Sequence, residues 1–218
     1  MSNIEKILAF NSLVQSNYRN NTPLFILHGL FGSKQNFGAI SKQIHQRLKS
    51  NIYTLDLRNH GDSFHSNTFN YQVMVNDVLN VAKSIGLNKI NVLGHSMGAK
   101  VAMNLALNSS SVVNQLLIVD MAPVDMRMSK AMQNYIDLMI QIDKKGVQSA
   151  NEADKILATE IPGSKSDYVV KEREDSIQKY FPNSTIEYLD TGHWVHSERP
   201  KEFLSLVENF LADKGQGV

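Results

Sequence analysis

The feature that most constrains the fold of this chain is the segment Gly-His-Ser-Met-Gly at residues 94–98. It follows a short apolar run at residues 90–93, and it precedes residues 101–106, whose apolar positions recur at helical spacing. This pattern predicts a strand, a sharp turn with Ser96 at its apex, and a helix. The two glycines indicate that neighbouring chain passes too close to the turn for side chains at those positions.

Other short apolar runs alternate with helical patterns along most of the chain. The predicted strands are residues 7–14, 24–27, 52–57, 90–93, 112–119 and 185–189, and the predicted helices are residues 37–48, 71–85, 97–107 and 203–210. This alternation predicts an α/β fold, a mostly parallel sheet flanked by helices. Active sites in such folds lie at the carboxyl ends of the strands, where Ser96, Asp120 and His193 are expected.

Composition excludes several other classes of protein. The 218 residues suit one domain, and the net charge of +1 gives no electrostatic reason to expect nucleic-acid binding. The chain has no cysteine, which excludes disulfides, thiolate catalysis and cysteine-ligated metals. The first ten residues do not read as a signal peptide, and no apolar stretch is long enough to span a membrane. We therefore expect a cytoplasmic protein.

The alternation of strands and helices breaks between residues 123 and 163. A methionine-rich helical stripe lies at residues 128–139, and residues 150–161 have the pattern of a second helix. We expect residues 123–163 to form a short helical lid, inserted into a core made of residues 1–122 and 164–218. The methionines either line an acyl pocket or pack the lid against the core.

A serine needs a general base to act as a nucleophile near neutral pH. The candidate is His193, in the segment Asp-Thr-Gly-His-Trp at residues 190–194, which follows the last predicted strand. Imidazole titrates near neutrality, so it can accept the serine proton and return it to a leaving group. His196 is the rival, but the position directly after a strand end favours His193.

A carboxylate is expected to orient the base, in the chain order serine, acid, histidine. Asp120 follows the strand at residues 112–119, and Asp167 also lies between Ser96 and His193. Asp120 has an alternative interpretation as a turn residue, and Asp167 has one as the N-cap of a following helix. Chain order alone leaves both acids open.

The oxyanion of a tetrahedral intermediate needs backbone N–H donors. We expect one from Met97, which follows the serine, and one from Leu30 in the glycine-rich segment at residues 28–32, with Phe31 as the second choice. His28 is expected to brace this loop by hydrogen bonding rather than to act as a catalyst.

Residues 58–63, Arg-Asn-His-Gly-Asp-Ser, follow another strand end and contain both a histidine and an aspartate. This combination also suits a second catalytic or metal site, but the favoured interpretation is a turn that braces the active-site loops. His45 and His65 have no partners at ligand spacing, so no metal site is predicted.

Together these segments resemble the α/β-hydrolase superfamily and, more narrowly, the bacterial esterases of the YbfF type and the abhydrolase domain-containing protein 11 family. The resemblance implies hydrolysis of carboxylic esters with small to medium acyl groups, without a cofactor. It also implies that Asp120 is the acid, because the family carries it in an Asp-x-Ala-Pro-Val segment, whereas many other α/β hydrolases carry it near the position of Asp167. The matching segments are residues 28–33, 56–63, 94–98, 120–124 and 192–196.

The sequence departs from this family after the first part of the lid. Relatives have a longer lid and a further apolar strand, and here part of the lid and that strand are absent. Their loss predicts a gap in the sheet between the strand ending at Val119 and the strand at residues 185–189. Three explanations are open. Residues 155–161 could fill the gap as a strand, the chain could be shorter than the natural protein, or the molecule could be destabilised.

The leading hypothesis is a serine esterase in which Ser96 forms an acyl-enzyme, His193 moves the proton and Asp120 orients His193. A catalytically impaired binding protein with the same fold is the alternative from another class, because a fold does not fix a function. A thioesterase or lactonase would use the same triad. The expected partner is a small acyl ester, and the sequence predicts neither the physiological substrate nor the oligomeric state.

Overall fold

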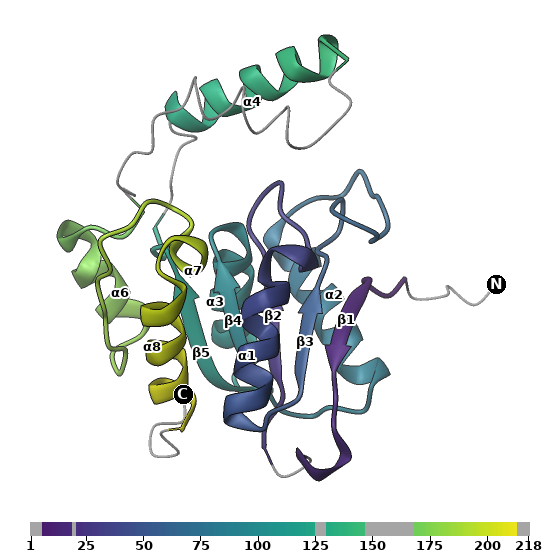
Figure 1. Cartoon of the computed structure of the whole chain (residues 1–218), viewed down its shortest axis with the longest axis vertical. Helices are drawn as coiled ribbons and strands as arrows, with labels where there is room; N and C mark the ends of the chain where they lie inside the picture. The colour runs from purple at the N-terminus through teal and green to yellow at the C-terminus, as the bar shows by residue number, and fades with distance from the viewer. Residues whose placement is uncertain (1–5, 19–20, 125–129, 147–167, 213–218) are drawn as a thin grey trace.

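The computed structural model of the chain describes residues 6–18, 21–124, 130–146 and 168–212 (Figure 1). Five strands in these residues form one sheet, and they are β1 (Phe10–Leu13), β2 (Leu24–Leu27), β3 (Ile52–Leu55), β4 (Ile90–His95) and β5 (Val113–Val119). Their order across the sheet is β1-β3-β2-β4-β5. β1 runs antiparallel to β3 at one edge, and the other four strands are parallel, as the alternation of elements predicted.

The central strands are buried on both faces. Every residue of β2, β3 and β4 is buried, which agrees with the continuous apolar runs typical of parallel strands covered by helices. Leu24 pairs with Ile52 of β3 and with Asn91 of β4, so the three strands begin level with one another. The loops that follow them therefore meet at one edge of the sheet, where Ser96 follows β4.

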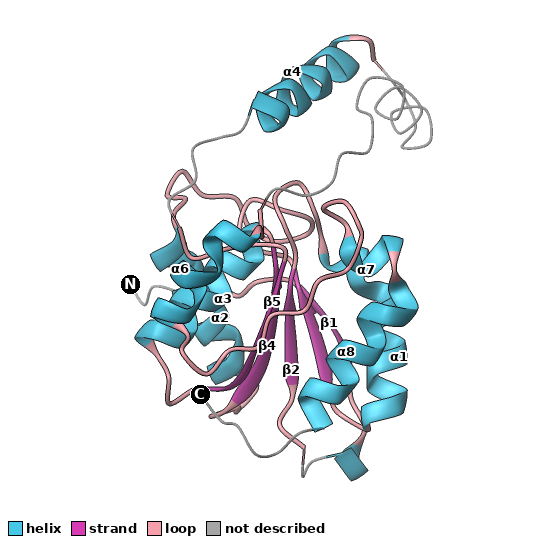
Figure 2. Cartoon of the chain, turned by 90° about the vertical axis from the view of Figure 1, so that its left-hand side faces the viewer, coloured by secondary structure: helices cyan, strands magenta, loops and turns pink. Residues whose placement is uncertain are grey.

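Helices cover both faces of the sheet (Figure 2). They are α1 (Gly38–Leu48), α2 (Tyr71–Ser84), α3 (Met97–Asn108) and α8 (Pro200–Ala212). Phe25 and Ile26, neighbours in β2, belong to two different apolar clusters because successive strand residues point to opposite faces. The cluster around Phe25 contains residues of α2 and α3, and the cluster around Ile26 contains residues of α1 and α8.

α4 (Lys130–Lys144) stands apart from this core, beyond the carboxyl ends of the strands (Figures 1 and 2). It contains most of the methionine-rich stripe that predicted the first lid helix. The second predicted lid helix, residues 150–161, and the alternative strand at residues 155–161 lie outside the described residues. The remaining short elements are η1 (Ser16–Tyr18), η2 (Lys34–Phe37), η3 (Lys171–Arg173), α6 (Glu174–Tyr180) and α7 (Val195–Glu198).

The prediction of a strand at residues 185–189 was wrong, because these residues have no regular secondary structure. A strand needs a neighbour that pairs with its backbone, and within the described chain β5 pairs with β4 alone. Leu189 nevertheless packs against the cluster that contains Phe203 and Val207. This segment therefore contributes to the core through side chains rather than through the sheet.

Candidate active site

Ser96 lies at the apex of a sharp turn between β4 and α3. Its backbone has φ 53° and ψ −116°, a strained conformation for a residue with a side chain. A Cβ on Gly94 would lie 2.4 Å from the Gly98 carbonyl oxygen, and a Cβ on Gly98 would lie 2.4 Å from the Leu27 carbonyl oxygen. The Ser96 N–H donates to the Val119 carbonyl oxygen at 3.1 Å, which ties the turn to the end of β5. The two glycines of the motif are thus required by close packing of the chain, as predicted.

Asp120 follows β5 and also has a positive φ, 51°. Its Oδ2 lies 2.5 Å from Nδ1 of His193, although the two residues are 73 positions apart in the sequence. An ionised carboxylate only accepts hydrogen bonds, so Nδ1–H is the donor, which leaves Nε2 of the neutral imidazole as an acceptor. The His193 side chain is 23% exposed and that of Asp120 is 8% exposed, so the ring keeps access to solvent while the carboxylate is nearly buried.

His95, the residue before Ser96, links the turn to the His193 segment. Its Nε2–H donates to the His193 carbonyl oxygen at 2.8 Å, and the centroids of the two rings lie 4.7 Å apart. Burial, and after it the neighbouring His193, lowers the pKa of His95 to about 3. The ring is therefore neutral at ordinary pH, with its single proton on the Nε2 that faces the carbonyl oxygen.

Residues 29–32 form a tight turn directly beside Ser96. The Gly32 N–H donates to the Gly29 carbonyl oxygen at 3.1 Å, and Phe31 has φ 61°. A positive φ at the third residue only is the pattern of a type II turn. A Cβ on Gly29 would lie 3.1 Å from the Cβ of Ser96, so the backbone of this turn is in contact with the serine.

The backbone N–H groups of Leu30 and Met97, like those of Phe31 and Gly98, donate no hydrogen bond among the described residues. Met97 is the first residue of α3, and the first N–H groups of a helix have no acceptor within the helix. Leu30 is the second residue of the turn that contacts the serine. N–H groups in such positions can donate hydrogen bonds to a negatively charged oxygen that develops beside the serine.

The structure places the ring of His196, the rival base, against Phe37. Its ring stacks on Phe37 with 4.1 Å between centroids and 20° between planes. The residue is buried, and burial, followed by the neighbouring His193, lowers its pKa to about 4. The rival acid, Asp167, lies outside the described residues.

His28 braces the loop after β2, as predicted. Its Nδ1–H donates to the Gly29 carbonyl oxygen at 2.7 Å, and its Nε2 accepts from the Leu57 N–H at 3.0 Å. Burial lowers the pKa of His28 to about 4, so the ring stays neutral and can make both bonds at once.

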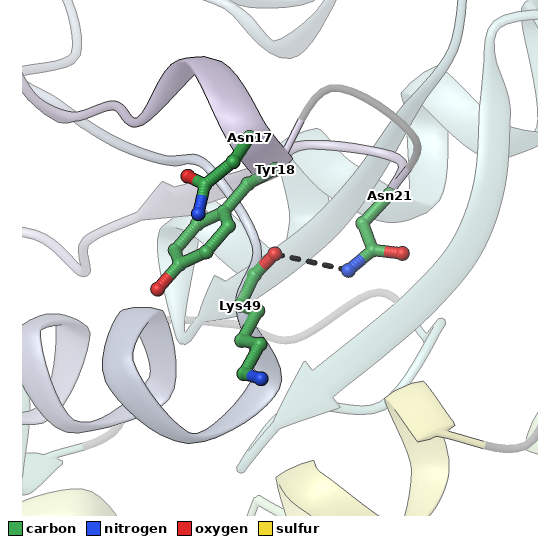
Figure 3. Close-up of a pocket in the computed structure, with 4 residues that line it drawn as sticks. All are labelled: Asn17, Tyr18, Asn21 and Lys49. Carbon is green, nitrogen blue, oxygen red and sulfur yellow. Dashed lines mark hydrogen bonds between the residues drawn. The ribbon is translucent and has the colours of Figure 1, made fainter.

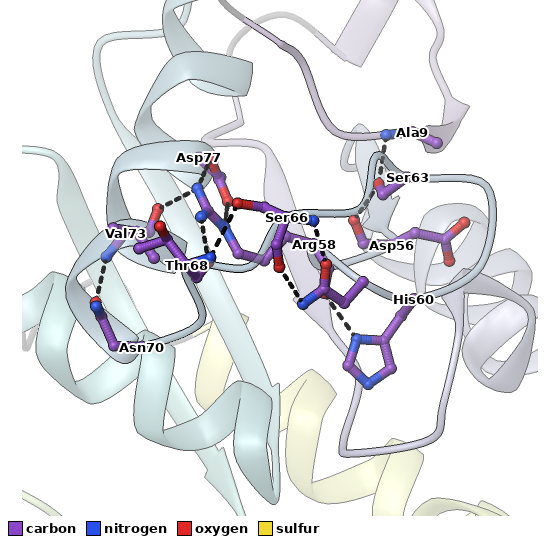
Figure 4. Close-up of polar contacts among 11 residues, drawn as sticks. Ala9, Asp56, Arg58, His60, Ser63, Ser66, Thr68, Asn70, Val73 and Asp77 are labelled. Atoms are coloured by element: carbon purple, nitrogen blue, oxygen red, sulfur yellow. Dashed lines mark hydrogen bonds and ion pairs between the residues drawn. The ribbon is translucent and has the colours of Figure 1, made fainter.

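The segment at residues 58–63 is also a bracing turn, as the favoured interpretation held (Figure 4). The Arg58 guanidinium donates to both carboxylate oxygens of Asp77, from Nε at 2.5 Å and from Nη2 at 2.7 Å. Ser63 Oγ–H donates to the Asp56 carbonyl oxygen at 2.6 Å and accepts from the Ala9 N–H at 2.8 Å. These bonds fix the turn to α2 and to the chain before β1.

Sequence reasoning missed a buried ion pair beneath the loop at residues 28–33. The ammonium of Lys34 contacts the carboxylate of Asp56 and, at 2.6 Å, that of Asp62, and the Lys34 N–H donates to Asp56 Oδ1 at 2.6 Å. Burial alone lowers the pKa of Lys34, but the hydrogen bonds with Asp56 and Asp62 outweigh it and raise the pKa overall. No spacing rule joins a lysine after one strand to an aspartate after another, so only the fold reveals the pair.

Three further residues around His193 were also missed. His95 was considered only as part of the turn motif, Tyr168 lies with its ring centroid 4.6 Å from that of His193, and Glu198 accepts from the Gly192 N–H at 2.7 Å. Glu198 lies in α7, a helix that the sequence did not predict, so no sequence signal pointed to these contacts.

A polar pocket lined by Asn17, Tyr18, Asn21 and Lys49 lies elsewhere on the molecule (Figure 3). Asn21 Nδ2–H donates to the Lys49 carbonyl oxygen at 2.9 Å. These two residues precede β2 and β3, so the pocket lies at the amino ends of the strands, opposite to the edge that carries Ser96. It is therefore separate from the candidate active site.

In the described parts of the chain, no group of three or more His, Cys, Asp or Glu residues is arranged to hold a metal ion. The same residues contain no helix long and apolar enough to cross a membrane. That the site works without a metal remains a prediction from the sequence.

Comparison with known proteins identifies the family and the fold of this chain. The family described as alpha/beta hydrolase fold matches residues 22–145. The sn-1-specific diacylglycerol lipase ABHD11 of Mus musculus is 30% identical, over 87% of this chain and 80% of the relative. A putative esterase/lipase of Haemophilus influenzae is 28% identical, over 88% of this chain and 84% of the relative. A solved marine microorganism esterase superposes with a TM-score of 0.81 at 23% identity, over 94% of this chain and 100% of that one.

The fold and these matches define the class of protein as an α/β hydrolase. Within that superfamily the chain belongs to the ABHD11-type family that its motifs indicated. The predicted fold class and the predicted enzyme class, a carboxylic ester hydrolase, are confirmed. The alignment with ABHD11 of Danio rerio runs over 250 residues, more than the 218 of this chain, so that relative carries residues without a counterpart here.

Proposed function

We propose that this protein hydrolyses carboxylic esters of small to medium acyl groups, with Ser96 as nucleophile, His193 as general base and Asp120 as the acid that orients His193. The observation that carries the proposal is the 2.5 Å hydrogen bond between His193 and Asp120 beside the strained turn of Ser96. That bond holds the proton on Nδ1, which leaves Nε2 free to accept a proton from the serine.

The reaction has two halves. Ser96 Oγ attacks the ester carbonyl carbon while its proton passes to His193 Nε2, and the carbonyl oxygen becomes an oxyanion. His193 then gives the proton to the leaving alcohol oxygen as the carbon–oxygen bond breaks, which leaves an acyl group on Ser96. Water then loses a proton to His193 Nε2 and attacks the acyl carbonyl carbon. His193 returns this proton to Ser96 Oγ as the bond between the acyl carbon and Oγ breaks, which releases the carboxylic acid and free Ser96.

The N–H groups of Leu30 and Met97 are proposed to hold the oxyanion. Two observations support them. Neither N–H is used by another described residue, and the Gly29 backbone lies against the Ser96 side chain. Fixed donors of this kind typically contribute about 3 to 4 kcal/mol each to the stability of the transition state.

Asp120 is proposed over Asp167 because its carboxylate already accepts from His193 Nδ1. An acid in this role does not take the proton, but it fixes the tautomer and stabilises the imidazolium that forms. Asp167 remains the alternative acid.

The proposed substrate class follows from the family and from the rim of the site. The relatives named above are a diacylglycerol lipase and an esterase/lipase. The side chains of Phe31 and Trp194, beside the proposed oxyanion donors and the base, are 49% and 37% exposed. Exposed aromatic surface next to the nucleophile suits an apolar acyl or alcohol group. Residues 123–163 are proposed as the lid over this rim.

Covalent labelling tests the proposal directly. A fluorophosphonate probe is expected to label the wild type on Ser96 and to leave Ser96→Ala unlabelled, and p-nitrophenyl acetate and butyrate should be hydrolysed by the wild type alone. A thioester and a lactone in the same assay distinguish the thioesterase and lactonase alternatives. A folded wild type that neither reacts with the probe nor hydrolyses any ester would favour the impaired binding protein instead.

A further inference from the structure

Two side chains, those of Glu198 and His95, hold the backbone of the His193 segment at three polar groups within residues 192–194. Glu198 Oε2 accepts from the Gly192 N–H at 2.7 Å, and Glu198 Oε1 accepts from the Trp194 N–H at 3.2 Å. Between these two bonds, the His193 carbonyl oxygen accepts from His95 Nε2–H at 2.8 Å. The peptide group between His193 and Trp194 is thereby held at both its C=O and its N–H, and the peptide group between Thr191 and Gly192 is held at its N–H.

The segment needs such bonds because no sheet supports it. Residues 185–189 are not a strand, and residues 190–194 have no regular secondary structure. The backbone that carries His193 therefore lacks the ladder hydrogen bonds that would place a residue after a strand. Local side-chain contacts are left to determine where the imidazole lies.

We propose that Glu198 and His95 are positioning residues that hold the His193 backbone in register with Ser96 and Asp120. This inference rests on the proposed function, in which His193 is the general base. Neither residue touches the reacting atoms in this account. They act through the loop, and the contribution expected of them is the alignment of Nε2 with Ser96 Oγ.

Glu198 suits this role because its own helix holds it in place. The Glu198 N–H donates to the Trp194 carbonyl oxygen at 2.9 Å, while the Glu198 carboxylate accepts from the Trp194 N–H. The two residues therefore bind each other reciprocally, in the manner of a capping interaction at the start of α7. The other carboxylate oxygen, Oε2, is free to accept from the N–H of Gly192, which precedes His193 in the chain.

His95 makes the connection to the nucleophile. It immediately precedes Ser96 and is fully buried, so its ring cannot move without moving the turn. Its bond to the His193 carbonyl oxygen fixes the base segment to the same turn that holds the serine. Because a misplacement of about 1 Å can reduce a reaction rate about 100-fold, this bond is expected to matter for kcat.

The first test compares Glu198→Ala and Glu198→Gln with Glu202→Gln, using p-nitrophenyl butyrate hydrolysis. Glu202 is a matched control, since it is half-exposed in the next helix and its carboxylate forms an ion pair with Arg199 at 3.6 Å. Glu198→Ala should lower kcat about 10- to 100-fold with KM changed less than about threefold. Glu198→Gln should lose less, because its amide oxygen still accepts one of the two N–H groups, and Glu202→Gln should match the wild type.

The second test does not depend on activity. Hydrogen exchange of the Gly192 and Trp194 amides, followed by NMR, should accelerate at least about tenfold in Glu198→Ala while the amides of β4 keep their rates. A wild type without esterase activity would overturn the proposed function, yet this exchange result would still show whether Glu198 holds the segment. Unchanged exchange, or accelerated exchange with an unchanged kcat, would overturn the positioning role.

His95 is tested by two substitutions, of which one keeps an N–H donor and the other does not. Gln can place an N–H near the position of the His95 Nε2–H, whereas Leu cannot. His95→Gln should therefore retain most of kcat, and His95→Leu should lose it by about the same factor as Glu198→Ala. Equal kcat values in the two folded variants would contradict a role for this bond. If His95→Leu does not fold, the Glu198 variants test the positioning role instead.

Discussion

Lys34 and Asp56 form an ion pair in which the aspartate is fully buried and the lysine is 7% exposed. The pair joins the helical turn after the proposed oxyanion loop to the end of β3. The Asp56 carboxylate also accepts hydrogen bonds from the backbone N–H groups of Lys34 and Asp62. Two loops of the candidate site are thus held together by one buried charge pair.

Substitution of Lys34 should therefore destabilise the protein strongly. Lys34→Met leaves the Asp56 carboxylate buried without its cation, which is expected to lower the free energy of unfolding by about 3 to 5 kcal/mol. Urea denaturation at pH 7 measures this change, with Lys42→Met on the exposed face of α1 as the control. A Lys34→Met protein as stable as the control would show that the pair contributes little.

Stability should also fall as the medium becomes moderately acid, because of the buried histidines. Burial lowers the pKa of His196 from 6.5 to about 4, so between these pH values the unfolded chain binds a proton that the folded chain does not. The free energy of unfolding therefore decreases as pH falls through this window, by about 2 kcal/mol for this residue at pH 5.

His196→Phe tests this pH dependence, because phenylalanine can keep the stacking on Phe37 without a titratable ring. The variant should lose less stability than the wild type when urea denaturation at pH 5 is compared with pH 7. If both proteins lose stability equally between these pH values, burial of His196 is not a source of the acid sensitivity.

A third prediction concerns the backbone strain at Phe31, in the loop beside Ser96. Its φ of 61° suits glycine better than a residue with a Cβ, and its side chain is half-exposed, so little burial is lost when it is removed. Phe31→Gly should consequently be more stable than Phe31→Ala by about 1 kcal/mol. Thermal denaturation of the two variants gives the comparison, and an alanine variant at least as stable as the glycine variant would contradict the strained turn.

The sequence predicted the parts of the site that depend on local chain geometry. The turn around Ser96 requires glycines at positions 94 and 98, and such a requirement is visible in a short segment. The bracing roles of His28 and of residues 58–63 were also predicted, because polar side chains at strand ends meet at one edge of a sheet.

Contacts between distant segments were harder to predict. The run at residues 185–189 has the composition of a strand, but composition does not show that no strand among the described residues pairs with it. Chain order could not choose between Asp120 and Asp167, since both lie between the serine and the histidine. The contacts of His95, Glu198 and Lys34 have no periodic signature, and they become visible only when the loops are placed together.

The central claim is that Ser96, His193 and Asp120 act as one catalytic unit. Its most direct test is the kcat of p-nitrophenyl butyrate hydrolysis for Asp120→Asn and Asp167→Asn, with circular dichroism to verify folding. We predict a loss of about 1,000- to 10,000-fold for Asp120→Asn, because asparagine favours the wrong imidazole tautomer, and a change of less than about threefold for Asp167→Asn. A folded Asp120→Asn enzyme with near wild-type kcat, or a crippled Asp167→Asn enzyme, would contradict the assignment.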